Sequence, residues 1–134
     1  MTTTSSDSPS PMGAAPVPPV AYPPQSSSDR LWGVLCHLSY FFGFALLSFL
    51  FPLIVYLVMR TDSPFVTDNA REALNFHLSI LLYAVCCIPL CFLVVGIPLL
   101  IALGIAGVVC SVVAAVKASE GVGYRYPMTV RFVR

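Results

Sequence analysis

The chain has 134 residues, of which 57% are hydrophobic and 10% are charged, and its formal net charge is +1. An ordinary soluble domain has about 25% charged residues, so this composition excludes a typical cytosolic enzyme. It also excludes a nucleic-acid binder, because such a protein needs a dense patch of Lys and Arg. The length allows a single domain.

The first 28 residues differ in composition from the rest of the chain. They contain seven of the twelve prolines, mixed with Thr, Ser and Ala, and Asp7 is their only charged residue. Such a segment buries too little apolar surface to offset the entropy that it loses on ordering. We therefore predict a disordered tail over residues 1–28 and a membrane domain over residues 29–134.

The first uncharged stretch of the membrane domain runs for 29 residues between Arg30 and Arg60. A helix of roughly 20 apolar residues crosses a bilayer core about 30 Å thick, so this stretch is long enough for one crossing and too short for two. We predict one long or kinked span over residues 31–59. The alternative is a break between Gly43 and Pro52, which gives two shorter helices and lets the first turn back towards its own side.

The loop after this stretch, residues 60–72, is the most polar part of the domain. Ser63 and Pro64 suit a turn or a helix start, and the sequence from Asn69 to Glu72 resembles a capping box that begins the next span. On a helix, five polar residues then fall within an arc of about 100°: Asp68, Arg71, Glu72, Asn75 and Ser79. This polar stripe is expected to face other helices or water, because facing lipid is costly.

The second uncharged stretch runs for 44 residues between Glu72 and Lys117. It predicts two spans, over residues 73–94 and 98–116, with the fold point at Gly96 and Pro98. We therefore expect an all-α, polytopic transmembrane bundle of three spans, or of four helices if residues 31–59 are broken.

The last segment, residues 120–134, alternates apolar and polar side chains. Aromatic and Arg side chains together favour the headgroup layer. We predict an interfacial segment that lies on the membrane surface or folds back against the 60–72 loop.

This segment and the polar loop form a candidate structural or partner-contact motif. Its residues are Ser63, Pro64, Asp68, Asn69, Arg71, Glu72, Asn75, Tyr124, Arg125, Tyr126 and Pro127. We expect Arg71 to contact the C-terminal segment, because both lie at the same face and helix start. The excess of Lys and Arg around the loop and the C-terminus predicts that this face is cytoplasmic. The side of the N-terminal tail depends on whether the first stretch crosses the membrane.

Candidate chemistry inside the spans is limited. His37 and His77 are intramembrane ionisable residues, which suggests a proton relay or a ligand site, although each can instead donate a structural hydrogen bond. The five cysteines all lie in apolar stretches and are expected to act as packing residues. Small residues at helical spacing in the last span predict a helix-packing ridge: Gly104, Gly107, Ser111 and Ala115. No catalytic set, metal site or cofactor motif is present, so we do not expect an enzyme.

Several short motifs resemble those of one protein family. They are His37-Leu38-Ser39, Pro52-Leu53-Ile54-Val55, Asp62-Ser63-Pro64-Phe65-Val66, the stretch from Asn69 to Phe76, Gly96-Ile97-Pro98-Leu99 and Tyr124-Arg125-Tyr126-Pro127. Over about residues 29–134 the chain resembles a small bacterial membrane-protein family of unknown function. That family is distantly similar to the twenty-kilodalton Tic subunit of the chloroplast protein-import translocon. The resemblance implies a multi-pass protein of the bacterial cytoplasmic membrane, with a role in protein translocation or membrane assembly, and it brings no catalytic residue.

The expected function is that of a structural or scaffold subunit in a membrane complex. The alternatives are a small channel or transporter with a polar path along Asp68–Ser79, and a component of protein translocation. The expected partners are the lipid bilayer and a membrane protein or a second copy of the chain. No nucleic acid, cofactor or small-molecule substrate is expected.

Overall fold

The computed structural model describes residues 22–42 and 45–134. Its regular elements within these ranges are α1 (Ser27–Leu38), the 3-10 helix η1 (Ser39–Phe42), α2 (Ala45–Val58), α3 (Pro64–Cys91) and α4 (Gly96–Ser119). The described residues contain no strand, so the all-α prediction is confirmed. Most of the predicted disordered tail, residues 1–21, lies outside the described residues.

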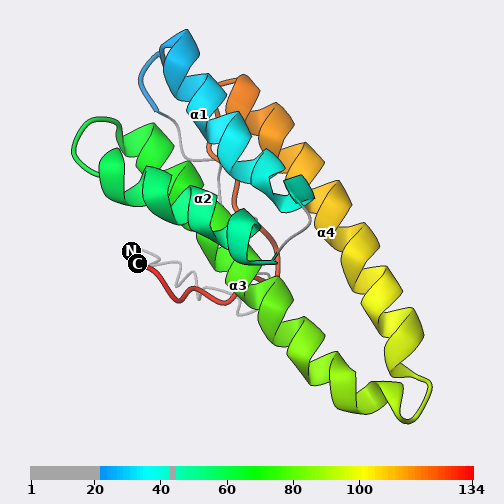
Figure 1. Cartoon of the computed structure of the whole chain (residues 1–134). Helices are drawn as coiled ribbons and strands as arrows, with labels where there is room; N and C mark the ends of the chain where they lie inside the picture. The colour runs from blue at the N-terminus through cyan, green and yellow to red at the C-terminus, as the bar shows by residue number, and fades with distance from the viewer. Residues whose placement is uncertain (1–21, 43–44) are drawn as a thin grey trace, which may run out of the picture.

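Helices α3 and α4 form a long antiparallel hairpin (Figure 1). They have 28 and 24 residues and are long and apolar enough to cross a membrane by length and composition. At 1.5 Å per residue they reach about 42 Å and 36 Å, against a bilayer core of about 30 Å. The fold point predicted at Gly96 is confirmed. No larger residue fits at this position without a backbone shift, because a Cβ atom there would lie 2.6 Å from the Cys87 carbonyl oxygen.

Helix α3 begins earlier than the sequence predicted, at Pro64 rather than after Asn69. Ser63 is the N-cap, and its side chain accepts a hydrogen bond from the Val66 amide. Pro64 is well placed in the first turn, where its missing N–H costs nothing. The Thr67 hydroxyl adds a hydrogen bond to the Met59 carbonyl at 2.8 Å. These contacts make most of the predicted polar loop the first two turns of α3.

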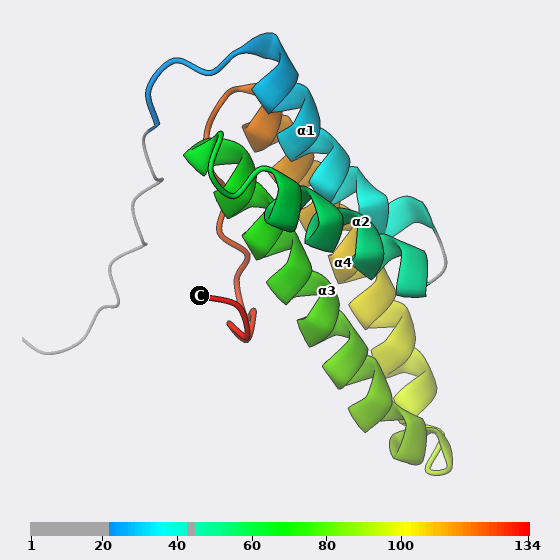
Figure 2. The same ribbon diagram turned by 60° about the vertical axis from the view of Figure 1, so that its left-hand side comes forward.

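Residues 31–59 do not form the single helix that we predicted, because α1 ends at Leu38 and α2 begins at Ala45. The four helices of the alternative are present, but the interruption precedes α2 and does not lie between Gly43 and Pro52. Helix α1 packs mainly on α4 and helix α2 on α3, and η1 follows α1 directly. With 14 residues, α2 is only about 21 Å long, which is too short to cross a bilayer core. Figure 2 shows that α1 and α2 cover one half of the α3–α4 hairpin and leave the other half bare.

The proline of α2 explains how the two short helices are tied together. Pro52 lies inside α2 and has no N–H for the Ser48 carbonyl four residues earlier. The Ser39 hydroxyl donates to that carbonyl at 3.1 Å and to the Cys36 carbonyl at 2.7 Å. A serine from η1 thus satisfies the acceptor that the proline leaves free.

The buried core lies in the half where all four helices meet. Cys36, Val55, Phe65 and Val66 belong to its larger apolar cluster, and Phe76, Ala114 and Tyr126 form a second cluster. The bare half of the hairpin is apolar but exposed, with Phe92 at 89% and Leu93 at 73% at its tip. Apolar side chains turned outward on this scale are typical of a surface that contacts lipid.

The C-terminal segment, residues 120–134, has no helix or strand. It leaves the end of α4 and runs back beside α3 (Figure 1). It contacts Glu72 of the 60–72 loop, against which folding back was one of our two predictions, and its contacts extend beyond that loop to Ser79 and Tyr83.

Candidate functional site

A hydrogen-bonded chain of buried side chains crosses the four-helix half of the molecule. The Tyr126 hydroxyl lies 2.8 Å from His37 Nδ1, and His37 Nε2 lies 2.9 Å from Asn69 Oδ1. The Asn69 amide nitrogen donates to the Phe65 carbonyl at 2.8 Å. His37 is completely buried and Asn69 is 1% exposed. This hydrogen-bonded chain joins the C-terminal segment, α1 and α3.

The donor and acceptor of each hydrogen bond in this series follow from the Phe65 carbonyl, which is the acceptor at its end. A backbone carbonyl only accepts, so Asn69 uses its amide nitrogen there and presents its oxygen to His37. His37 Nε2 therefore carries the proton, Nδ1 accepts, and the Tyr126 hydroxyl donates. Burial raises the pKa of Tyr126 well above its ordinary value of 10, which keeps this hydroxyl protonated. The ring of Tyr126 also stacks on Phe76, with centroids 4.0 Å apart.

Asn75 and Ser79, from the predicted polar stripe, hold the C-terminal segment against α3. The Asn75 amide nitrogen donates to the Val133 carbonyl at 2.9 Å, and its oxygen accepts from the amides of Phe132 and Val133 at 3.0 and 2.8 Å. The Ser79 hydroxyl oxygen accepts from the Val130 amide at 2.9 Å. The stripe therefore supplies the hydrogen bonds that an irregular segment cannot make to itself.

The charged residues of α3 lie one to two turns nearer its start. Arg71 pairs with Asp68 on its own helix, while Arg131 Nε lies 3.8 Å from Glu72 Oε1. Glu72 and Asn75 thus contact the C-terminal segment directly, and Arg71 lines a pocket together with arginines of that segment. Asp68 also accepts a hydrogen bond of 2.6 Å from Tyr22, so the described end of the predicted tail packs on α3.

The remaining motif residues lie at the same side of the bundle. The Tyr124 and Tyr126 rings meet edge to face at 5.2 Å, and Pro127 is exposed in the turn that follows. Arg125 is exposed beside them.

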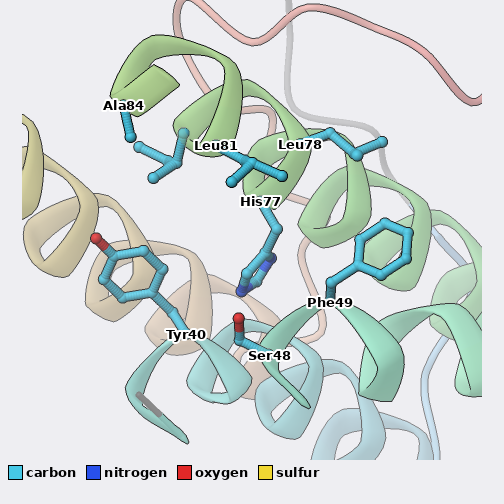
Figure 3. Close-up of a pocket in the computed structure, with 8 residues that line it drawn as sticks. Tyr40, Ser48, Phe49, His77, Leu78, Leu81 and Ala84 are labelled. Carbon is cyan, nitrogen blue, oxygen red and sulfur yellow. The ribbon is translucent and has the colours of Figure 1, made fainter. Parts of the chain in front are cut away.

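His77 leaves α3 on another side and lines a pocket of about 370 Å³ (Figure 3). The pocket lies between α2, α3 and η1, and Figure 3 shows the His77 ring pointing towards Ser48, with Tyr40 on one side and Phe49 on the other. Its other lining residues are apolar: Phe49, Leu78, Ile80, Leu81 and Ala84. His77 is 8% exposed.

The hydrogen bond on the other ring nitrogen determines what His77 can do. Nδ1 lies 2.5 Å from the Ala73 carbonyl, which only accepts, so Nδ1 carries the proton in the neutral ring. Nε2 is then an acceptor, and it is buried without a hydrogen-bond partner. The pocket thus presents the Nε2 acceptor in a lining that also contains the hydroxyl-bearing Tyr40 and Ser48.

The predicted helix-packing ridge is only partly in contact. Ser111 and Ala115 are buried, and Gly107 lies against Tyr40, where a Cβ atom would be 2.6 Å from the ring carbon Cζ. Gly104 faces open space, with nothing within 4 Å of such an atom. The packing face of α4 therefore begins at Gly107.

Sequence reasoning missed Tyr22, Ser39, Tyr40 and Ser48 as members of these sites. Ser39 and Ser48 could have been found from Pro52, because a proline inside a helix frees the carbonyl four residues earlier. Nothing local to Tyr22 or Tyr40 indicates a partner, since Asp68 and Gly107 lie far along the chain.

Comparison with known families identifies the chain. The model of a family described as the magnetosome magnetite crystal formation protein family matches residues 28–133. The chain belongs to this family. No curated protein and no solved structure matches it. The predicted bacterial membrane-protein family is thus shown, but the comparisons do not support the distant likeness to the chloroplast Tic subunit.

A link to magnetite directs attention to groups that bind iron. In the described part of this magnetosome-family chain, no three His, Cys, Asp or Glu side chains gather as they would around a metal ion. Three of the five acidic side chains in the described ranges are in ion pairs: Asp68 with Arg71, Glu72 with Arg131, and Glu120 with Lys117.

Proposed function

We propose that this magnetosome-family protein is an integral membrane scaffold for magnetite crystal formation, without enzymatic activity. In this proposal α3 and α4 cross the bilayer, and α1 and α2 form a hairpin that enters to about half its depth. The observation that carries it is the distribution of charge. Every charged residue in the described ranges falls within 29–30, 60–72 or 117–134, and the antiparallel helices bring these segments to one end (Figure 1).

The positive charges support an orientation. All seven Lys and Arg residues lie at the charged end, and an excess of these residues is typical of the cytoplasmic side. The N-terminal end of α1 and the C-terminus would then both face the cytoplasm. The opposite end of the hairpin bears no charged side chain, so within residues 22–42 and 45–134 a carboxylate contact with a mineral would have to come from the charged end. This arrangement favours action through the membrane or a protein partner.

The polar stripe does not support the channel alternative. Asn75 and Ser79 are engaged by the C-terminal segment, and Asn69 is bonded to His37. A conducting path needs polar groups that face water, whereas these side chains have protein partners.

The test combines fractionation with crystal measurement. In cells that form magnetite, the tagged chain should stay with the membranes after alkaline carbonate extraction. Its deletion should alter crystal size or number in electron micrographs, and mild-detergent purification should retain a membrane-protein partner or a second copy. Release of the chain by carbonate would refute membrane insertion.

Proteoliposomes separate the scaffold from the channel. The scaffold predicts ion flux equal to that of empty vesicles. Flux that appears with the wild-type chain and is lost in Asn75→Leu would instead support a polar path.

A further inference from the structure

A second pocket, of about 420 Å³, lies between α3 and the C-terminal segment. Four arginines line it, Arg71, Arg125, Arg131 and Arg134, together with the single carboxylate of Glu72. The chain has only seven basic residues, so more than half of them surround this one cavity. Such a gathering is unusual in a protein whose net charge is +1.

The carboxylates nearby do not balance these arginines. Arg71 is paired with Asp68, and Arg131 lies opposite Glu72 at 3.8 Å. Arg125 and Arg134 have no carboxylate partner among the described residues. The four guanidinium groups face the side-chain carboxylates of Asp68 and Glu72 and the terminal carboxylate of Arg134 itself. The cluster therefore keeps a net positive charge, and an anion in the pocket would reduce the repulsion among its arginines.

The position of the pocket indicates where that anion comes from. Counting about 20 residues, the length that crosses a bilayer core, back along α3 from the exposed tip at Phe92 leads to Glu72. The pocket therefore lies at the level of the lipid headgroups. Apolar side chains of the same C-terminal segment point outward beside it, with Met128 85% and Phe132 52% exposed, as expected of residues that dip into lipid.

We propose that this pocket binds the phosphate of an anionic phospholipid headgroup. Guanidinium groups form paired, charge-assisted hydrogen bonds with phosphate oxygens, and basic pockets between membrane helices on the cytoplasmic side suit such headgroups. The acyl chains would lie along the bare apolar surface of α3. The inference rests on the membrane insertion proposed above, but not on the scaffold role.

The experiment is native mass spectrometry of the full chain in mild detergent with equal amounts of phosphatidylglycerol and phosphatidylcholine. The wild type should retain phosphatidylglycerol in preference. Each surface arginine contributes about fivefold to anionic-lipid affinity, so Arg125→Gln/Arg134→Gln should weaken retention about 25-fold. Glutamine preserves much of the side-chain length, and circular dichroism checks that the helices remain.

The matched control is Arg30→Gln/Arg60→Gln, which removes the same charge from the same end but outside the pocket. Retention of phosphatidylglycerol by this control should stay within about twofold of the wild type. A larger loss would indicate a general effect of charge and would overturn the proposed site. Added inorganic phosphate tests the other source of this chemistry. Saturation of the pocket by millimolar phosphate, without preference for phosphatidylglycerol, would also overturn the proposal. Release of the protein from membranes by alkaline carbonate would refute membrane insertion itself. Retention in the membrane without a preference for phosphatidylglycerol would refute only this inference.

Discussion

His37 is fully buried and both of its ring nitrogens are bonded, one to Tyr126 and one to Asn69. A buried histidine with two partners holds its ring in one orientation and one tautomer. Removing either partner leaves a desolvated polar atom, which costs about 1–3 kcal/mol. His37 thus links α1, α3 and the C-terminal segment.

Replacing Tyr126 by Phe tests this link. The change keeps the stacking on Phe76 but leaves His37 Nδ1 without a donor, so the free energy of unfolding should fall by about 1–3 kcal/mol at neutral pH. Denaturant or thermal unfolding in detergent measures it. Tyr56→Phe is the control, because Tyr56 lies outside this hydrogen-bonded chain.

The pH dependence of the same variant provides an independent check. Burial raises the pKa of Tyr126 above 10 in the folded state, so above pH 10 the unfolded chain loses this proton and the folded chain keeps it. The stability contributed by the phenol is therefore present below pH 10 and is lost as the pH rises beyond it. The difference between wild type and Tyr126→Phe should shrink above pH 10, and a constant difference would contradict the assignment.

The sequence marked His37, Asn69 and Tyr126 as candidates but could not connect them. The hydrogen bonds span 32 and 89 residues, and no periodicity reports contacts at such a distance. Asn69 was assigned to a helix cap because its neighbours fit one, whereas Ser63 caps the helix.

At the scale of elements, the contact between α4 and η1 depends on one glycine. Tyr40 of η1 lies against Gly107, and its ring also meets Phe76 at 5.8 Å. Because a Cβ atom at Gly107 would overlap the Tyr40 ring, α4 could not approach η1 as closely with any other residue there.

Gly107→Ala and Gly104→Ala form a matched pair. The first should destabilise the fold by about 1–3 kcal/mol, because the Tyr40 ring must shift in a packed environment. The second should be neutral or stabilising by up to about 1 kcal/mol, because alanine favours a helix and nothing lies near it. Thermal unfolding of both variants in the same detergent measures the two changes in stability. Equal changes would refute the α4–η1 contact.

The C-terminal segment depends on α3 for its order. Asn75→Leu removes three hydrogen bonds to residues 132 and 133 and should free this end of the chain. Limited proteolysis should then cleave within residues 128–134 several times faster, and the melting temperature should fall. Thr61→Ala, at an exposed site, should leave the cleavage rate unchanged; the same rate in Asn75→Leu would show that the segment is held by other contacts.

The break within residues 31–59 shows why hydropathy alone cannot count helices. The stretch is continuously apolar and has no charge to mark a turn, so one long span fits its composition. The break is accompanied by a hydrogen bond from the Ser39 hydroxyl to the Ser48 carbonyl, which lies four residues before Pro52. In contrast, the α3–α4 hairpin was predicted because Gly96 and Pro98 interrupt a stretch long enough for two helices.

At the scale of the whole molecule, the two ends differ completely in charge. The arrangement predicts that Ser28 and Thr61 face the same side of the membrane, whereas a single span over 31–59 would separate them. Single cysteines at these positions, in a chain whose five native cysteines are replaced by alanine, should both react with an impermeant thiol reagent in inside-out vesicles. Labelling from opposite sides would refute the half-depth hairpin.

The turn at the tip of the α3–α4 hairpin also bears on how the protein is made. From Phe92 to Val95 it presents only exposed apolar side chains, and its backbone amides at Phe92, Leu93 and Val94 donate to carbonyls in the last turn of α3. Each charged residue at the centre of a spanning helix would oppose insertion by about 2.5–3.5 kcal/mol, and this tip carries none across. In the proposed topology the hairpin would insert from the ribosomal side as one unit, with no translocated domain. The exposed apolar tip then predicts that the nascent chain aggregates unless it is delivered to the membrane during synthesis.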